Sequence, residues 1–438
     1  IPADPLFRSS YMKDIKWHIG VALCCVMMVS GCVRNQFDQQ RYEEIVEDES
    51  PTPKVDEDHD WMMSTTKTLV VDPSGIENLK LVRIFTDNPA EEVSAEIVDD
   101  AYPSGDNKIV MNISYPIRLQ VLYAAAIDNE DYYTIVPFNP NSSGSIDFSN
   151  PIVKHQKMSN YFVHQTCVYL YEEEYPQPGD YDFNDVVLRV SMERSDGQEV
   201  RFNIELAAVG GTKQMGAAIR LAGYKYNEVE SVKTEDDASF DITGVGELPD
   251  MYRTMIQDKS LLQQSMNGEA VLNLFADAHW ATGDRIISDN GSITRKRYNV
   301  SNEKSDEYGT FYPREITYIV TFKNGVDVSS LTLDVLDAFI IEEYNGNKYE
   351  VHTHKYSKAQ VLWPNPSSDA HNLPWAFCVP YNKFCWPLHA VAIGYQVTSK
   401  RFTYGAYPYI GRSFGEWAAD RTQCINWYLY PDKDQVYK

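Results

Sequence analysis

The residues whose types and spacing best suit chemistry lie in one short segment, residues 179–185, which reads Gly-Asp-Tyr-Asp-Phe-Asn-Asp. Oxygen donors at this density are typical ligands of a hard cation such as Ca²⁺. The segment starts like an EF-hand loop, but Asp185 stands where that loop has glycine and Ser191 where it has glutamate. We therefore predict a Ca²⁺ site of another type, with these candidate ligands: Asp180, Asp182, Asn184 and Asp185.

The alternative to a cation site is a set of Asx-turns, in which the Asp and Asn side chains cap their own backbone before a strand. Three carboxylates this close in the sequence repel one another unless a positive charge lies between them, which favours the cation. Further oxygen ligands could come from the neighbouring acidic run, Glu172, Glu173 and Glu174.

Histidines and cysteines offer less specific patterns. His352 and His354 are two apart on a predicted strand and would share one face, with His371 and His389 as further zinc ligands. Four cysteines follow residue 100, and in an exported protein an even number permits disulfides: Cys167, Cys378, Cys385 and Cys424. Cys378 and Cys385 flank a turn-like segment and could pair across it. Free thiols are the alternative.

Signatures of catalysis and of nucleic-acid binding are missing from the sequence. It contains no Gly-x-Ser-x-Gly, no His-Glu-x-x-His, no phosphate-binding loop and no dinucleotide-binding glycine pattern. Residues 210–213, Gly-Gly-Thr-Lys, lack the spacing of a phosphate loop and are interpreted as a turn. The net charge of -24 disfavours a nucleic-acid partner. We therefore expect a protein that is not an enzyme.

The first part of the chain has the pattern of a lipoprotein leader. Met12 is the expected start, followed by Lys13 and Lys16, an apolar stretch over 19–29 and the run Ser30-Gly31-Cys32. The stretch is shorter than the about 20 residues that cross a bilayer as a helix, and it has the length of a signal peptide core. We predict cleavage before Cys32, lipidation of that residue and attachment to the membrane through the lipid.

Composition then divides the chain into four parts. Residues 1–31 are upstream residues plus signal peptide, and residues 32–64 are an acidic, flexible tether that is too polar to order itself. Residues 65–151 contain strand-length apolar runs between turn formers, which is typical of a small β-sandwich. Residues 160–438 are also rich in strands and tyrosine. One helix is expected near 250–266. The predicted fold class is mainly β, with two β-sandwich-like domains.

Four ordered segments resemble the LruC/DUF4842 domain of exported lipoproteins of the Bacteroidetes type. The first is the acidic loop with Val186-Val187. The others are Asp337-Ala338-Phe339-Ile340-Ile341 with Tyr349-Glu350-Val351-His352, Leu373-Pro374-Trp375 with Trp386-Pro387-Leu388, and Ala406-Tyr407-Pro408 with Trp417 and Asn426-Trp427-Tyr428. The chain departs from the family pattern at Ala338, His389 and Asn426, where relatives carry Pro, Glu and Asp. The resemblance implies location and architecture, because the family has no known function.

These observations lead to one main functional hypothesis and two alternatives. We expect a non-enzymatic, lipid-anchored protein of the outer membrane, exposed at the cell surface, with an adhesive or structural role and a Ca²⁺-stabilised acidic loop. The first alternative is a glycan-binding accessory of a polysaccharide uptake system, with exposed Trp and Tyr stacked on sugar rings; buried core aromatics are the structural interpretation of the same residues. The second is a glycan hydrolase with two catalytic carboxylates. The expected partners are the membrane and a glycan or surface protein.

Overall fold

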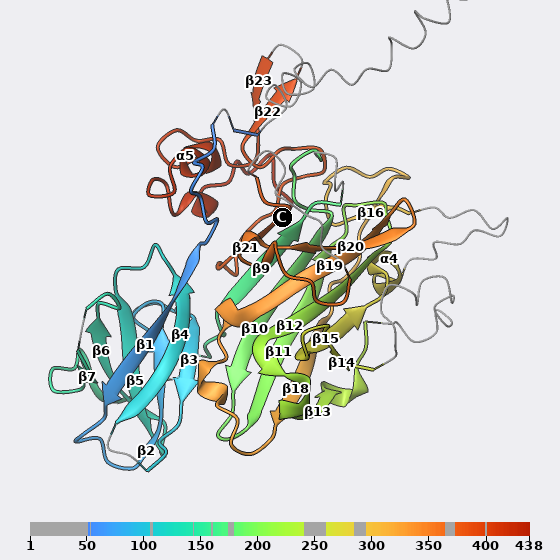
Figure 1. Cartoon of the computed structure of the whole chain (residues 1–438). Coiled ribbons are helices and arrows are strands. Elements are labelled where there is room, and N and C mark those ends of the chain that lie inside the picture. The colour runs from blue at the N-terminus through green and yellow to red at the C-terminus, as the bar shows by residue number, and fades with distance from the viewer. Residues whose placement is uncertain are drawn as a thin grey trace, which may run out of the picture. The chain divides into compact units, whose positions relative to one another are not determined.

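The computed structural model describes residues 51–52, 54–105, 108–142, 144–158, 161–173, 179–240, 260–283, 295–363, 373–398 and 401–438. The predicted leader, Cys32 and residues 32–50 of the tether lie outside the described residues. The fold is mainly β, as predicted, with many strands and two short α-helices among the described residues (Figure 1). No helix in the described ranges has the length and apolarity that a membrane crossing requires.

A small two-layer sandwich follows residue 63. Its first sheet has the order β4-β1-β7 and its second the order β3-β2-β5-β6-β8. The strands are β1 (Ser64–Asp72), β2 (Leu79–Phe85), β3 (Ile97–Ala101), β4 (Ile109–Pro116), β5 (Leu122–Asp128), β6 (Tyr132–Phe138), β7 (Ile146–Asp147) and β8 (Val153–Lys157). Apolar side chains from both sheets, such as Val71 and Ile84, form one core between the layers.

A larger sandwich contains a six-stranded sheet of order β13-β18-β11-β10-β9-β21 and a five-stranded sheet of order β14-β15-β12-β19-β20. Their bounds are β9 (Thr166–Tyr171), β10 (Val186–Arg194), β11 (Glu199–Ala208), β12 (Met215–Lys225), β13 (Val229–Thr234), β14 (Leu262–Gln264), β15 (Glu269–Phe275), β18 (Glu315–Phe322), β19 (Leu336–Tyr344), β20 (Asn347–His352) and β21 (Ala376–Val379). All pairings within these two sheets are antiparallel.

The alternation of side chains along β11 explains the position of the main core. Val200, Phe202 and Ile204 point inward and pack against the five-stranded sheet, while the residues between them face outward. The inner face of this sheet is therefore apolar, and the outer face is polar where nothing covers it.

The remaining elements are short: β16 (Arg297–Tyr298), β17 (Tyr308–Gly309), β22 (Tyr395–Thr398), β23 (Arg401–Tyr404), α4 (Ala278–Ala281) and α5 (Phe414–Ala419). The helix predicted over 250–266 is wrong at its C-terminal end, because β14 occupies Leu262–Gln264 and pairs with β15. Residues 241–259 lie outside the described residues. Leu262, Gln263 and Gln264 of β14 pair with the apolar run Ala270–Leu272 of β15. This pairing with the sheet outweighs the helical preference of the segment.

The end of the predicted tether is packed rather than flexible. Trp61 is 5% exposed, and its ring lies 5.4 Å from the Trp417 ring and 5.7 Å from the Phe377 ring. The Asp56 N–H donates to the Ala418 carbonyl at 2.8 Å. The prediction of a tether through residue 64 is therefore wrong for this stretch. Acidic residues dominated the composition, but Trp61 and Met63 bury enough apolar surface to order their segment.

Candidate functional site

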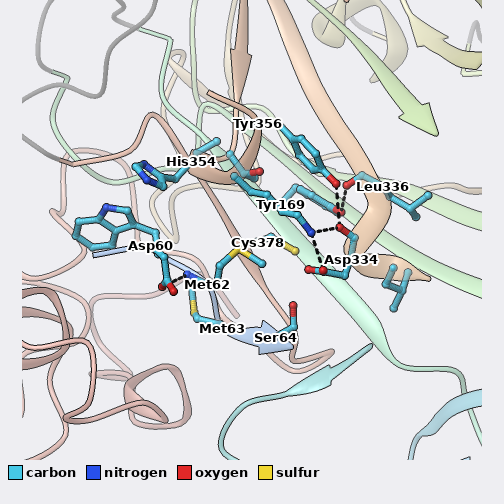
Figure 2. A pocket seen from close by; sticks show the side chains of 15 residues that line it. Asp60, Met62, Met63, Ser64, Tyr169, Asp334, Leu336, His354, Tyr356 and Cys378 are labelled. Carbon is cyan, nitrogen blue, oxygen red and sulfur yellow. Dashed lines mark hydrogen bonds and ion pairs between the residues drawn. The ribbon is translucent and has the colours of Figure 1, made fainter. Parts of the chain in front are cut away.

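A small pocket lies beside the segment that leads into β1 (Figure 2). Met62, Met63 and Cys378 are among the residues that line it. Its volume is about 30 Å³, which is room for roughly one water molecule. Tyr356 donates to the Asp334 carbonyl at 3.0 Å beside it. The pocket is a packing gap beside residues 60–64 and is too small for an organic ligand.

Side chains of the acidic loop (residues 179–185) alternate between two surroundings. Tyr181 and Phe183 lie in the apolar core, and Asp180 and Asp182 lie in a polar group. Tyr181 and Phe183 have positive φ angles of 58° and 52°, which bulky residues rarely adopt. Both rings are buried in the aromatic core that Trp417 and Trp427 help to form. Burial of the two rings stabilises this unusual backbone and directs Asp180 and Asp182 away from the core.

Asp182 is the fixed centre of the loop. It is fully buried, and one carboxylate oxygen accepts the Asn184 N–H at 2.9 Å while the other accepts the Ala390 N–H at 2.8 Å. The second bond joins the loop to a segment 208 residues further along the chain. It also brings His389 to the loop, with its Nδ1 atom 3.5 Å from Asp182 and 3.8 Å from Asp180.

Asp180, Asp182 and His389 form one group whose ligand atoms all lie within 4.8 Å of one another. The pKa of Asp180 is raised to about 7 by loss of hydration and then by the negative charge of Asp182. Two of the four predicted ligands therefore meet in space, and the structure adds a histidine that the prediction did not place there.

Asn184 and Asp185 have other partners. The Asn184 side-chain amide donates to the Pro387 carbonyl at 3.0 Å, and Asp185 accepts the Glu173 N–H at 2.6 Å. Burial and nearby carboxylates raise the pKa of Asp185 well above its usual range. These two residues hold the loop against its neighbours, and the structure does not bring them into the group around His389.

Glu172 is a further buried carboxylate close enough to Asp180 and Asp182 to feel their charge. It is 1% exposed, and its Oε1 atom accepts the Phe183 N–H at 2.7 Å. Its Oε2 atom is buried and has no hydrogen-bond partner among the described residues. Burial raises the pKa of Glu172 well above its usual range, and the charges of Asp180 and Asp182 add to that effect. An orphaned buried oxygen beside two further carboxylates fits a site built for a cation.

The Gly-Gly-Thr-Lys segment, interpreted as a turn, binds the Glu173 carboxylate. Thr212 and Lys213 donate their backbone N–H groups to it at 2.8 and 2.7 Å. A Cβ atom at Gly211 would lie 2.4 Å from a Glu173 oxygen, and one at Gly210 would lie 1.8 Å from the Asn184 side-chain oxygen. The glycine pair thus permits the close backbone approach that the acidic loop requires.

The other candidates separate in space. His352 bonds to Asp337 and Glu350, whereas His389 lies beside Asp180 and Asp182, so the zinc hypothesis that joined the two histidines is wrong. His371 lies outside the described residues. All four described cysteines are free thiols, so the alternative of free thiols holds and the predicted disulfides are absent among them.

The motif tryptophans are core residues at 0–5% exposure, which contradicts the idea that they stack on sugars: Trp375, Trp386, Trp417 and Trp427.

Sequence reasoning named His389 as a possible zinc ligand but did not place it at the acidic loop. The one available signal was its position in the Pro-Leu-His segment, where the resemblance to the family leads us to expect Glu. A family model described as "Domain of unknown function (DUF4842)" matches residues 198–428. A crystal structure of a "Putative lipoprotein from Bacteroides ovatus" is 16% identical, with a TM-score of 0.48, and the match covers 83% of this chain and 100% of that chain. No curated protein matches the chain.

Proposed function

The chain belongs to the DUF4842 family, and from this premise we propose that it is a non-enzymatic, lipid-anchored protein of the outer envelope. Its role in this proposal is adhesive or structural at the cell surface, and its acidic loop binds Ca²⁺. The observation that carries the cation is the buried, unpartnered Oε2 atom of Glu172 next to the carboxylates of Asp180 and Asp182.

The donor set suits a divalent ion. Three carboxylates from two segments would supply oxygen ligands, and water would complete the six to eight ligands that Ca²⁺ takes: Glu172, Asp180 and Asp182. A bound cation would neutralise the charges of these carboxylates, which otherwise repel one another where little water reaches them. It would also tie β9 and the loop to the segment around His389, and so stiffen one end of the larger sandwich.

Chelation of Ca²⁺ is expected to lower the melting temperature by several degrees, because the carboxylates then repel one another without a counter-charge. Asp180→Asn keeps the shape of the loop and should abolish the response to EDTA. Glu230→Gln on β13, an exposed acid far from the loop in the sheet order, should respond like the wild type. The measurement is differential scanning fluorimetry with CaCl₂ or EDTA, followed by calorimetric titration of Ca²⁺, Mn²⁺ and Zn²⁺ into stripped protein. Equal melting temperatures in Ca²⁺ and EDTA, with no titration heat for any ion, would contradict the cation site.

The proposed cellular location depends on lipidation of Cys32, which has its own test. Cells that express the full chain are expected to incorporate radioactive palmitate into it, and Cys32→Ser should remove the label completely because the thioether needs the thiol. Cys424→Ser, which also removes one thiol, should stay labelled. An unlabelled wild-type chain, or a labelled Cys32→Ser variant, would contradict the lipid anchor.

A further inference from the structure

A second site lies on the outer face of the six-stranded sheet. Its cavity has a volume of about 450 Å³, within the range of about 300 to 1,000 Å³ that is typical of small-ligand sites. The sheet contributes Ser191, Glu193, Asn203 and Glu315, and the small sandwich contributes Arg83 and Tyr133. Residues 161–164 of the connection and Thr166 also line the cavity. The acidic loop contributes no residue to this lining.

The outer face of the six-stranded sheet carries a row of polar side chains. Ser191 pairs with Asn203, and Asn203 with Thr317, across three neighbouring strands. Val190 and Ile204, next in sequence to these residues, point into the core, so the row faces outward. The Thr317 hydroxyl donates to the Asn203 side-chain oxygen at 2.8 Å, which restrains the amide. A fixed planar amide is well suited to hydrogen-bond a ligand's hydroxyl groups.

Aromatic and imidazole groups stand beside this row. Tyr161 is 90% exposed, which is unusual for so large a ring, and it lines the same cavity. The Nε2 atom of His164 is buried and has no hydrogen-bond partner among the described residues. Burial lowers the pKa of His164, so the ring can donate or accept a hydrogen bond without carrying a charge.

The charges around the cavity disfavour an anion. Arg83 is already paired with Asp100 at 2.6 Å, and the other residues of the two sandwiches that line the cavity with a group charged at neutral pH are the acids Glu193 and Glu315. The cavity thus offers an exposed ring, a planar amide, a hydroxyl and acceptor oxygens. This combination fits an uncharged ligand with many hydroxyl groups, whose ring face can stack on tyrosine.

We infer that this cavity binds a neutral oligosaccharide, with Tyr161 as the stacking platform and Asn203 as the hydrogen-bonding group. The inference does not depend on the acidic loop or its cation. It places a sugar site on tyrosine and amide residues, and the buried tryptophans of the family motifs take no part in it.

The test uses the full-length protein on an array of neutral hexasaccharides with gluco, xylo, manno and galacto configurations, followed by calorimetric titration of the best binder. Tyr161→Ala and Asn203→Ala are each expected to weaken binding at least ten-fold, and Tyr161→Phe should retain it. Tyr312→Ala is the matched control, since this tyrosine is 92% exposed and does not line the cavity. Tyr161→Ala and Tyr312→Ala should keep the wild-type melting temperature, because both rings are exposed. Asn203 is half-buried and bonds to Thr317, so the melting temperature of Asn203→Ala is measured beside its affinity to confirm that the variant is folded.

Two outcomes would overturn the inference: no binding to any hexasaccharide on the array, or equal binding by wild type, Tyr161→Ala and Asn203→Ala. Each titration is repeated in EDTA and in CaCl₂. Binding that persists in EDTA supports the cavity even if the acidic loop binds no ion. Binding that vanishes in EDTA and in Asp180→Asn would place the sugar at the acidic loop and overturn the cavity site.

Discussion

Replacing Arg194 by alanine is expected to lower the free energy of unfolding by about 4 kcal/mol, as removal of one partner of a buried ion pair does in general. Arg194 is 8% exposed at the end of β10, and its guanidinium bonds to Asp99 on β3 at 2.8 to 3.0 Å. It also donates to the backbone carbonyls of Val328, Ser329 and Leu331.

The loss in Arg194→Ala has two physical causes. Asp99 stays buried without its positive partner, although burial already raises its pKa to about 6 against the opposing effect of Arg194. The three carbonyls also lose a donor in a place that water reaches poorly. Because the contact joins β3 of the small sandwich to β10 of the large one, a separate unfolding transition of the small sandwich is expected in the variant.

Urea unfolding followed by tryptophan fluorescence and by far-UV circular dichroism measures both effects. Arg201→Ala on the neighbouring strand is the control, because Arg201 is 34% exposed and pairs with Glu199 and Glu235 near the surface; its loss should cost less than about 1 kcal/mol. The double variant Arg194→Met with Asp99→Asn should recover part of the stability, since no buried charge remains. A loss in Arg194→Ala no larger than in Arg201→Ala would refute the role of this contact.

His352→Gln is expected to remove a pH dependence of stability that is worth about 3 kcal/mol between pH 6.5 and 9. His352 is fully enclosed, with Nδ1 2.8 Å from Asp337 and Nε2 3.2 Å from Glu350. Burial by itself lowers the pKa of His352, but the two carboxylates, Asp337 first, raise it to about 9.

The direction of the effect follows from the raised pKa. The folded protein holds the His352 proton more tightly than the unfolded chain, in which the pKa of histidine is about 6.5. The stabilising contribution is therefore complete below pH 6.5 and is lost as the pH rises towards 9. The wild type should lose stability over this interval, and His352→Gln should lose about 3 kcal/mol less over the same interval.

Glu350, which bonds to His352, also holds a neighbouring segment in place. Its carboxylate accepts the backbone N–H groups of Val361 and Trp363 at 2.8 Å, and that of Leu362, so it holds the segment after η6 (His354–Tyr356) against β20. Urea titrations at several pH values measure the slope. His155→Gln is the control, because the His155 side chain is 64% exposed. A wild-type slope in His352→Gln would contradict the assignment.

The sequence by itself determined the class of the fold and the density of oxygen-bearing side chains in its most unusual loop. Alternating patterns such as Val200 to Leu206 on β11 follow from a local period of two, which any strand with one buried face must show. Asp180 and Asp182 are two residues apart in the chain, so the sequence alone places both in one loop. The resemblance to DUF4842 rested on motifs whose aromatic residues form the core.

Tertiary structure alone decided which residues complete each site. The Ala390 N–H bonds to Asp182 across 208 residues, and this contact selects His389 as a neighbour and leaves Asn184 and Asp185 to other partners. Packing of Trp61 on Trp417 likewise ordered a segment whose charge predicted a flexible tether. Such contacts depend on which surfaces meet after the strands have formed, and no local pattern of residues records that choice.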